Sequence, residues 1–194
     1  MIILIIGGSK SGKSHLAQRI TKALAGDGSP VCGPMIYWAT MEPTDGEDRA
    51  RIEKHIADRA GWGFETVERG RDIARLPIPC SREASVLFDS VTALVTNELF
   101  GGIGAGTEPD AEDAKRRSLE GLIRLSESVR HFVCVADDVF RDGFSFDGMT
   151  ETWRRALAEV VRGFAEHADT VLEASCGLAK VRKGVMTPLY EEEK

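Results

Sequence analysis

The sequence is poor in aromatic residues, in paired cysteines and in long apolar stretches, and each shortage excludes a class of protein. Aromatic residues make up 7% of the 194 positions, too few for the stacking platforms of single-stranded nucleic-acid binders. The four cysteines form no Cys-x-x-Cys pair, so zinc and dithiol motifs are not expected and a reducing cytoplasm fits. The opening apolar run, Met1–Ile6, is far shorter than the roughly 20 residues of a membrane span, and it lacks the basic start and cleavage site of a signal peptide.

Basic charge is also in short supply. Lys and Arg total 25 against 31 Asp and Glu, which gives a formal net charge of −6. This balance argues against a dedicated partner such as nucleic acid or an anionic membrane. The length and the 42% hydrophobic content are those of a single globular domain. We expect that domain to cover residues 1–184 and a polar, mobile tail to follow over residues 185–194.

Short apolar runs alternate with longer helical patterns along the chain, as in proteins with a parallel α/β sheet. The run Ile2–Ile6 is continuously apolar, which is typical of a strand buried on both faces. The predicted strands are Ile2–Ile6, Met35–Ala39, Phe64–Val67, Ser85–Asp89, Phe132–Ala136 and, as the last strand, Thr170–Ala174. The predicted helices are Ser14–Leu24, Glu47–Arg59, Thr92–Phe100, Ala111–Val129 and Glu151–His167.

The strongest motif follows the first predicted strand and opens the first predicted helix. It fits the phosphate-loop pattern G-x-x-x-x-G-K-[ST] with the residues Gly7, Gly8, Ser9, Lys10, Ser11, Gly12, Lys13 and Ser14. Gly7 and Gly12 permit backbone angles that other residues avoid, so that successive N–H groups can surround an anion. Lys13 is predicted to bind the β- and γ-phosphates, and Ser14 to bind Mg²⁺. The expected architecture is therefore a P-loop, NTP-binding, three-layer α/β fold with a mainly parallel central sheet.

A Mg²⁺ site needs a second oxygen ligand at the end of a neighbouring strand. The apolar run Val86–Phe88 ends in Asp89, as a Walker-B carboxylate does. The alternative role for Asp89 is to cap the helix that begins near Thr92, and both roles are compatible.

Other P-loop classes lack support in the sequence. No Asn-Lys-x-Asp motif is present and no Asp-x-x-Gly begins at Asp89, so a switch-type GTPase is not expected. The absence of Leu-Ser-Gly-Gly argues against an ABC ATPase. A small-molecule kinase or a nucleotidyltransferase remains.

One predicted helix carries Arg51, His55 and Arg59 at four-residue spacing, which places them on one face. A neutral imidazole is a competent nucleophile toward phosphorus, and the flanking guanidinium groups disfavour its protonation. On spacing alone, however, the pattern is more typical of a solvated polar helix face.

These segments together resemble one enzyme family of cobalamin (vitamin B12) biosynthesis, the adenosylcobinamide kinase / adenosylcobinamide-phosphate guanylyltransferases. The resemblance runs in order through most of the chain. Its segments are the phosphate loop, Tyr37-Trp38-Ala39-Thr40, Arg51-Ile52-Glu53-Lys54-His55 with Arg59, Thr66-Val67-Glu68, Asp89-Ser90-Val91-Thr92 with Thr96-Asn97, and Ala168-Asp169 with Gly177.

The resemblance implies a two-step function and assigns His55 a role. The enzyme would phosphorylate adenosylcobinamide with ATP or GTP; His55 would then take GMP from GTP and pass it to adenosylcobinamide phosphate. Lys13 would assist catalysis, and Ser14 and Asp89 would hold Mg²⁺. The resemblance also implies a homotrimer. The residues implied to line the guanine nucleotide are Ala39, Thr40, Met41, Ile56, Ala57, Asp58, Arg59, Glu68 and Asp89.

The chain departs from the family pattern mainly in its C-terminal half. Where the family has Thr-Asn-Glu-Val-Gly, this chain has Ala136-Asp137-Asp138-Val139-Phe140. Two alternatives to the bifunctional enzyme follow. One is a diverged relative with either the kinase or the guanylyltransferase activity, and the other is a non-catalytic, nucleotide-responsive regulator.

Overall fold

A computed structural model describes residues 1–26, 33–42, 61–75, 77–101, 109–140 and 146–185. The described strands are β1 (Ile2–Gly7), β2 (Met35–Ala39), β3 (Phe64–Glu68), β4 (Ser85–Asp89), β5 (His131–Asp137), β6 (Thr170–Ser175) and β7 (Leu178–Lys183). The described helices are α1 (Lys13–Ala25), α3 (Val91–Phe100), α4 (Ala111–Glu127) and α5 (Gly148–His167). The predicted α/β fold with a mainly parallel sheet is confirmed.

The seven described strands form one sheet in the order β3-β2-β4-β5-β1-β6-β7. Neighbouring strands from β3 to β6 are parallel, whereas β7 runs antiparallel to β6. The carboxyl ends of six strands therefore meet at one edge of the sheet, where ligands of open α/β sheets bind. β1, which leads into the phosphate loop, lies between β5 and β6.

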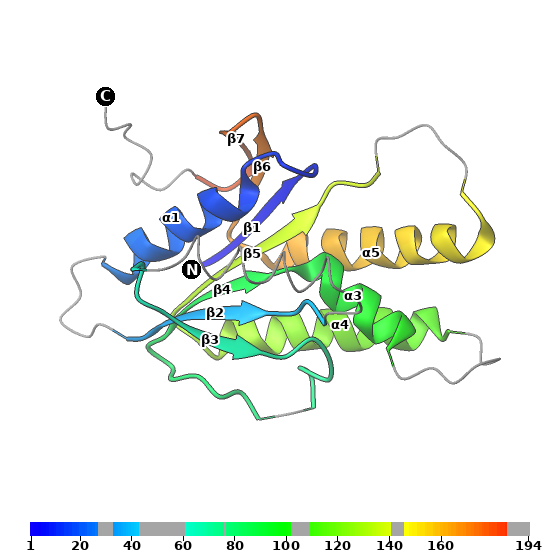
Figure 1. Cartoon of the computed structure of the whole chain (residues 1–194), viewed down its shortest axis with the longest axis horizontal. Helices are drawn as coiled ribbons and strands as arrows, with labels where there is room; N and C mark the ends of the chain where they lie inside the picture. Colours follow the sequence, from blue (N-terminus) through cyan, green and yellow to red (C-terminus); the bar gives the residue numbers. More distant parts are fainter. Residues whose placement is uncertain (27–32, 43–60, 76, 102–108, 141–145, 186–194) are drawn as a thin grey trace.

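Helices cover both faces of the sheet, which explains why its central strands are apolar throughout (Figure 1). One face packs against α1 through residues such as Ile5, Leu16 and Ile20. The other face is covered by α3, α4 and α5. There the rings of Phe88, Phe132 and Phe164 follow one another, with centroids 5.8 and 5.9 Å apart.

Predicted strand positions agree with the structure, and the differences at helix ends have local causes. α5 begins at Gly148, before the predicted Glu151, because the Asp147 carboxylate accepts a hydrogen bond from the N–H of Thr150 at 2.8 Å and caps the helix. The prediction that the strand at Thr170 is the last one is wrong, since β7 follows it. The predicted helix Glu47–Arg59 lies outside the described residues, as does nearly all of the predicted tail.

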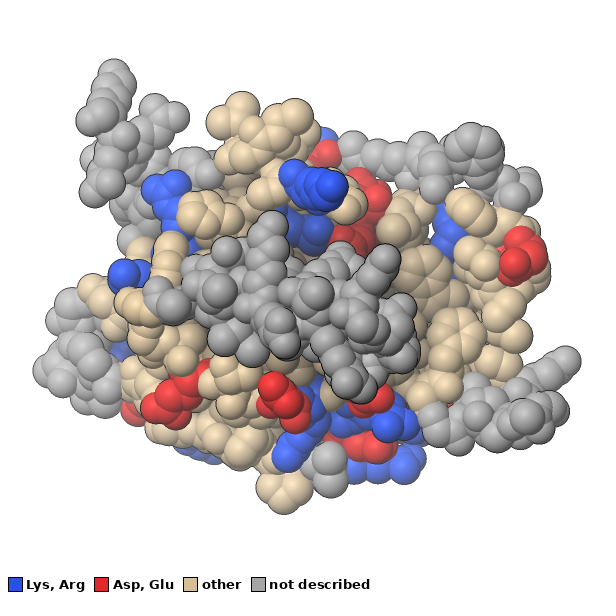
Figure 2. Space-filling model, viewed as in Figure 1, with Lys and Arg blue, Asp and Glu red and all other residues tan. Residues whose placement is uncertain are grey.

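The surface carries charges of both signs. On the face shown in Figure 2, acidic and basic side chains lie interspersed over the part of the chain that the structure describes. Among the described helices, none combines the length and the apolar character that crossing a membrane requires.

Candidate nucleotide site

The phosphate loop connects the end of β1 to the start of α1 at the carboxyl edge of the sheet. Two of its residues, Lys10 and Gly12, have positive φ angles of 57° and 92°, so the backbone turns sharply enough to form an anion nest. No side chain caps the N-terminus of α1, and its first turn holds no acidic residue. The first N–H groups of the helix are thus in the arrangement that binds phosphate.

The turn between β6 and β7 supports the phosphate loop from the other end of the chain. The N–H of Gly177 donates to the carbonyl oxygen of Ser11 at 2.9 Å. A Cβ atom on Gly12 would lie 3.1 Å from the Cα of Gly177, in addition to its unfavourable φ. A Cβ atom on Gly7 would lie 2.5 Å from Ser11 Oγ and 2.7 Å from the carbonyl oxygen of Ala174. The glycines at both ends of the loop are therefore required by close packing as well as by backbone conformation.

Lys13, the predicted phosphate-binding lysine, lies folded back over the loop. Its Nζ atom is 2.7 Å from Asp137 Oδ1 at the end of β5, and it also donates to the carbonyl oxygen of Gly8 at 3.2 Å. The sequence prediction missed Asp137. The same signal that singled out Asp89, an apolar run ending in an acid, is present in Val133-Cys134-Val135-Ala136-Asp137.

Further predicted site residues lie at the ends of β2, β3 and β4, on the same edge as the phosphate loop. Ala39 is in register with both Glu68 and Asp89, so these three strand ends are neighbours. Ala39, Thr40, Met41, Glu68 and Asp89 are thereby brought to one edge of the sheet.

Asp89 is held by a hydrogen bond rather than used as a helix cap. The hydroxyl of Tyr37 donates to Asp89 Oδ2 at 2.9 Å. The N-cap of α3 is Ser90, whose hydroxyl accepts from the N–H of Ala93 at 3.2 Å. The alternative of Asp89 as the cap is therefore wrong.

Thr40 is fully buried and bonded to protein through each of its polar atoms. Its hydroxyl accepts from the N–H of Ser90 at 2.7 Å and donates to the carbonyl oxygen of Ser90 at 2.9 Å. Its own N–H donates to the carbonyl oxygen of Asp89, and its carbonyl oxygen accepts from the side chain of Asn97. Thr40 thus fixes the end of β2 against the turn that carries Asp89.

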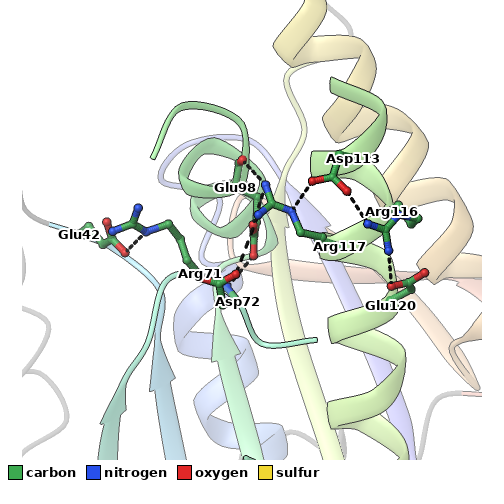
Figure 3. A network of polar contacts seen from close by, with 8 residues as sticks. All are labelled: Glu42, Arg71, Asp72, Glu98, Asp113, Arg116, Arg117 and Glu120. Atoms are coloured by element: carbon green, nitrogen blue, oxygen red, sulfur yellow. Dashed lines mark hydrogen bonds and ion pairs between the residues drawn. The ribbon is translucent and has the colours of Figure 1, made fainter. Parts of the chain in front are cut away.

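A charged network holds the segment after β3 against α3 and α4 (Figure 3). At its centre Glu98, whose side chain is 1% exposed, accepts from the N–H of Asp72 at 2.7 Å and pairs with Arg117 at 3.3 Å. Burial raises the pKa of Glu98, while the Asp72 N–H and Arg117 act in the opposite direction. Arg117 and Arg116 both contact Asp113, which extends the network along α4.

The remaining predicted site residues, His55, Ile56, Ala57, Asp58 and Arg59, lie outside the described residues. The chain is described again from Gly61 onward. The ring of Trp62 lies between two α1 side chains, with its centroid 6.0 Å from the ring of His15 and 5.1 Å from Lys22 Nζ. The described chain thus resumes beside α1, the helix that the phosphate loop opens.

A family model described as cobinamide kinase / cobinamide phosphate guanyltransferase matches residues 3–181. This range includes all seven described strands apart from the first residue of β1 and the last two residues of β7. The chain belongs to this family.

Three relatives of known name agree with the cobinamide kinase / cobinamide phosphate guanyltransferase assignment. Bifunctional adenosylcobalamin biosynthesis protein CobP of Pseudomonas aeruginosa is 31% identical over 186 residues, which are 93% of this chain and 96% of the relative. The proteins named CobU from Escherichia coli and Salmonella typhimurium are 40% and 34% identical over 114 and 129 residues. These two alignments cover 58% and 64% of this chain, and 58% and 65% of the relatives' own lengths.

Proposed function

We propose that this chain is a bifunctional transferase of cobalamin biosynthesis. It phosphorylates adenosylcobinamide and then transfers GMP from GTP to the product, adenosylcobinamide phosphate. The observation that carries the proposal is a complete phosphate loop between a buried strand and a helix, in a chain that the family model matches over residues 3–181. We further propose a cytoplasmic homotrimer as the working form.

In the kinase step, the hydroxyl of the aminopropanol arm attacks the γ-phosphorus of ATP or GTP. The bond between the γ-phosphorus and the bridging oxygen breaks, the hydroxyl proton is released, and a nucleoside diphosphate leaves. The first N–H groups of α1 and the Lys13 ammonium bind the phosphate oxygens on which charge accumulates. The hydroxyl of Ser14 and a carboxylate at this edge of the sheet, which the sequence predicts to be Asp89, are hard oxygen ligands of the kind Mg²⁺ prefers. Bound Mg²⁺ would neutralise the phosphates.

In the guanylyl step, a ring nitrogen of His55 attacks the α-phosphorus of GTP. A P–N bond forms, the bond to the bridging oxygen breaks, and pyrophosphate leaves from the phosphate loop. A phosphate oxygen of the second substrate then attacks the same phosphorus and the P–N bond breaks, which gives adenosylcobinamide-GDP and restores the imidazole. The residues proposed to surround the guanine nucleotide are Ala39, Met41, Ile56, Ala57, Asp58, Arg59, Glu68 and Asp89, with the carboxylate of Glu68 accepting from the donor-rich guanine edge. Thr40, which is fully buried and bonded to protein, would shape this site by fixing the end of β2 rather than by touching the nucleotide.

Labelling with GTP carrying radioactive phosphorus at the α position tests the proposal. We expect the protein to acquire label that acid removes and base does not, as for a phosphoramidate. His55→Ala should abolish the label, whereas the matched variant His15→Ala should retain it. Equal labelling of His55→Ala and the unchanged protein would show that His55 is not the nucleophile.

Separate assays of the two steps distinguish the bifunctional enzyme from its alternatives. Phosphate transfer to adenosylcobinamide without GMP transfer, or the reverse, would identify a relative with one activity. The altered segment Ala136–Phe140, which lies beside Lys13 through Asp137, is the feature that favours this alternative. GTP binding with no turnover of either substrate would identify a nucleotide-responsive regulator.

A further inference from the structure

Among the described residues, the carboxylate of Asp137 pairs with Lys13 of the phosphate loop at 2.7 Å. The side chains of Lys13 and Asp137 are 12% and 32% exposed. The lysine is thus mostly enclosed, while the carboxylate remains open to a ligand. The Lys13 ammonium that should bind phosphate is neutralised by an acid in this arrangement.

The backbone fixes Asp137 in this position. Asp137 is in register with Gly7, the first residue of the phosphate loop, on the adjacent strand β1. Its N–H donates to the hydroxyl of Thr92 at 2.8 Å, and the N–H of Asp138 donates to the carbonyl oxygen of Gly7 at 3.0 Å. Asp137 is therefore anchored on both sides, to α3 and to β1, and only its side chain is free to change partner.

Asp89, the metal ligand predicted from the sequence, lies further from the loop. It is in register with Val135, two residues before Asp137, or about 7 Å back along β5 at roughly 3.3 Å per residue. Its strand, β4, is separated from β1 by β5. One of its oxygens also accepts from Tyr37, whereas Asp137 projects beside the loop itself.

An anionic carboxylate beside a phosphate loop has an electrostatic consequence. A triphosphate entering the loop is repelled by Asp137 and must compete with it for Lys13. A divalent cation that accompanies the triphosphate removes both effects, because the carboxylate can bind the cation and release the ammonium to the phosphates. Mg²⁺ bound with phosphates needs only one or two protein oxygen ligands, so the absence of any three-residue acidic or histidine cluster among the described residues does not conflict with such a site.

We propose that Asp137 is a metal-dependent counter-ion of the phosphate loop. Its carboxylate holds Lys13 in the nucleotide-free protein and binds the Mg²⁺ that arrives with the nucleotide, together with the hydroxyl of Ser14. This inference rests on the proposed function in one respect, which is that the loop binds a nucleoside triphosphate.

The test compares the affinity for GTP in excess Mg²⁺ with the affinity in EDTA, measured by calorimetric titration of the full chain. The informative variant is Asp137→Asn, which removes the charge of the side chain and keeps its shape. We expect it to bind GTP roughly tenfold more tightly in EDTA, as for removal of one close like charge. The gain in affinity on adding Mg²⁺, which is large for the unchanged protein, should shrink by a similar factor or more.

Asp138→Asn is the matched control, since it removes the same charge one residue further along and leaves the pair between Lys13 and Asp137 intact. Its dependence on Mg²⁺ should equal that of the unchanged protein. Equal effects of both variants, or no effect of Asp137→Asn, would overturn the inference while leaving the proposed function standing. A protein that binds no GTP in either condition contradicts the proposed function and this inference together.

Discussion

The side-chain amide of Asn97 donates to the carbonyl oxygen of Thr40 at 2.6 Å and to that of Gly70 at 3.2 Å. One α3 side chain therefore joins the segments that follow β2 and β3. A Cβ atom on Gly70 would lie 2.5 Å from the Asn97 amide nitrogen and 2.6 Å from the Thr40 carbonyl oxygen, so the three residues are in tight contact. Asn97 therefore helps to fix the position of Thr40, next to the predicted guanine site.

Replacing Asn97 should destabilise the protein through the loss of these two hydrogen bonds. Asn97→Ala leaves the carbonyl oxygens of Thr40 and Gly70 without this donor, and we expect a loss of about 1–3 kcal/mol in the free energy of unfolding. Asn97→Asp keeps the shape but cannot donate once ionised, so at neutral pH it should lose at least as much. Urea unfolding measures both. An Asn97→Ala protein as stable as the parent would show that the two hydrogen bonds contribute nothing.

Thr40 offers a second test at the same place, because its buried hydroxyl both donates to and accepts from Ser90. Thr40→Val removes the hydroxyl while keeping the branched shape, and we expect it to cost about 1–3 kcal/mol. Thr40→Ser keeps the hydroxyl and should cost less. The comparison is made by chemical denaturation, and the opposite ranking of the two variants would mean that the methyl group matters more than the hydrogen bonds.

Two helical glycines should respond to alanine in opposite directions. A Cβ atom on Gly121 of α4 would lie 2.4 Å from Ile73 Cγ1 and 3.0 Å from the backbone nitrogen of Ala74. Gly121→Ala should therefore cost about 1–3 kcal/mol through overpacking. Gly148, at the start of α5, has no atom within 4 Å of such a Cβ, so Gly148→Ala should stabilise by up to about 1 kcal/mol. Thermal unfolding should show a lower melting temperature for Gly121→Ala and a higher one for Gly148→Ala than for the unchanged protein.

Glu98 should make stability depend on pH in a defined direction. Burial raises its pKa above the ordinary 4.5, so the folded protein holds the Glu98 proton more tightly than the unfolded chain does. Ionisation then opposes folding. The free energy of unfolding of the parent, relative to Glu98→Gln, should fall as pH rises from below 4.5 through the raised pKa of the folded state. Denaturation over a pH series measures this difference, and a rise with pH would contradict the assignment.

The sequence predicted the central strands because burial on both faces leaves a plain signal. Met35–Ala39 and Ser85–Asp89 have the predicted bounds. β7 was not predicted because it is an edge strand with exposed Arg182 and half-buried Val181, so no apolar run marks it. Its pairing depends on partners in β6, where Glu173 forms an ion pair with Arg182. Such a strand is visible only once its neighbour is known.

In the candidate site, too, local features could be predicted from the sequence, whereas contacts between distant segments could not. The phosphate loop was predicted because its chemistry is local, contained in eight consecutive residues. The pair between Lys13 and Asp137 could not be predicted, since it depends on β5 lying beside β1, and strand order does not follow from any local pattern. The nucleotide contact proposed for Glu68 stays a prediction, as does the role of His55.

The placement of β1 between β5 and β6 has a consequence for biosynthesis of the protein on the ribosome. β1 is translated first, yet both of its partner strands come from the last third of the chain. Gly177, which donates a hydrogen bond to Ser11 of the phosphate loop, is translated after both of them. The phosphate loop thus cannot reach its folded conformation until nearly the whole polypeptide has left the ribosome. A prematurely terminated product would carry the motif without the ability to use it.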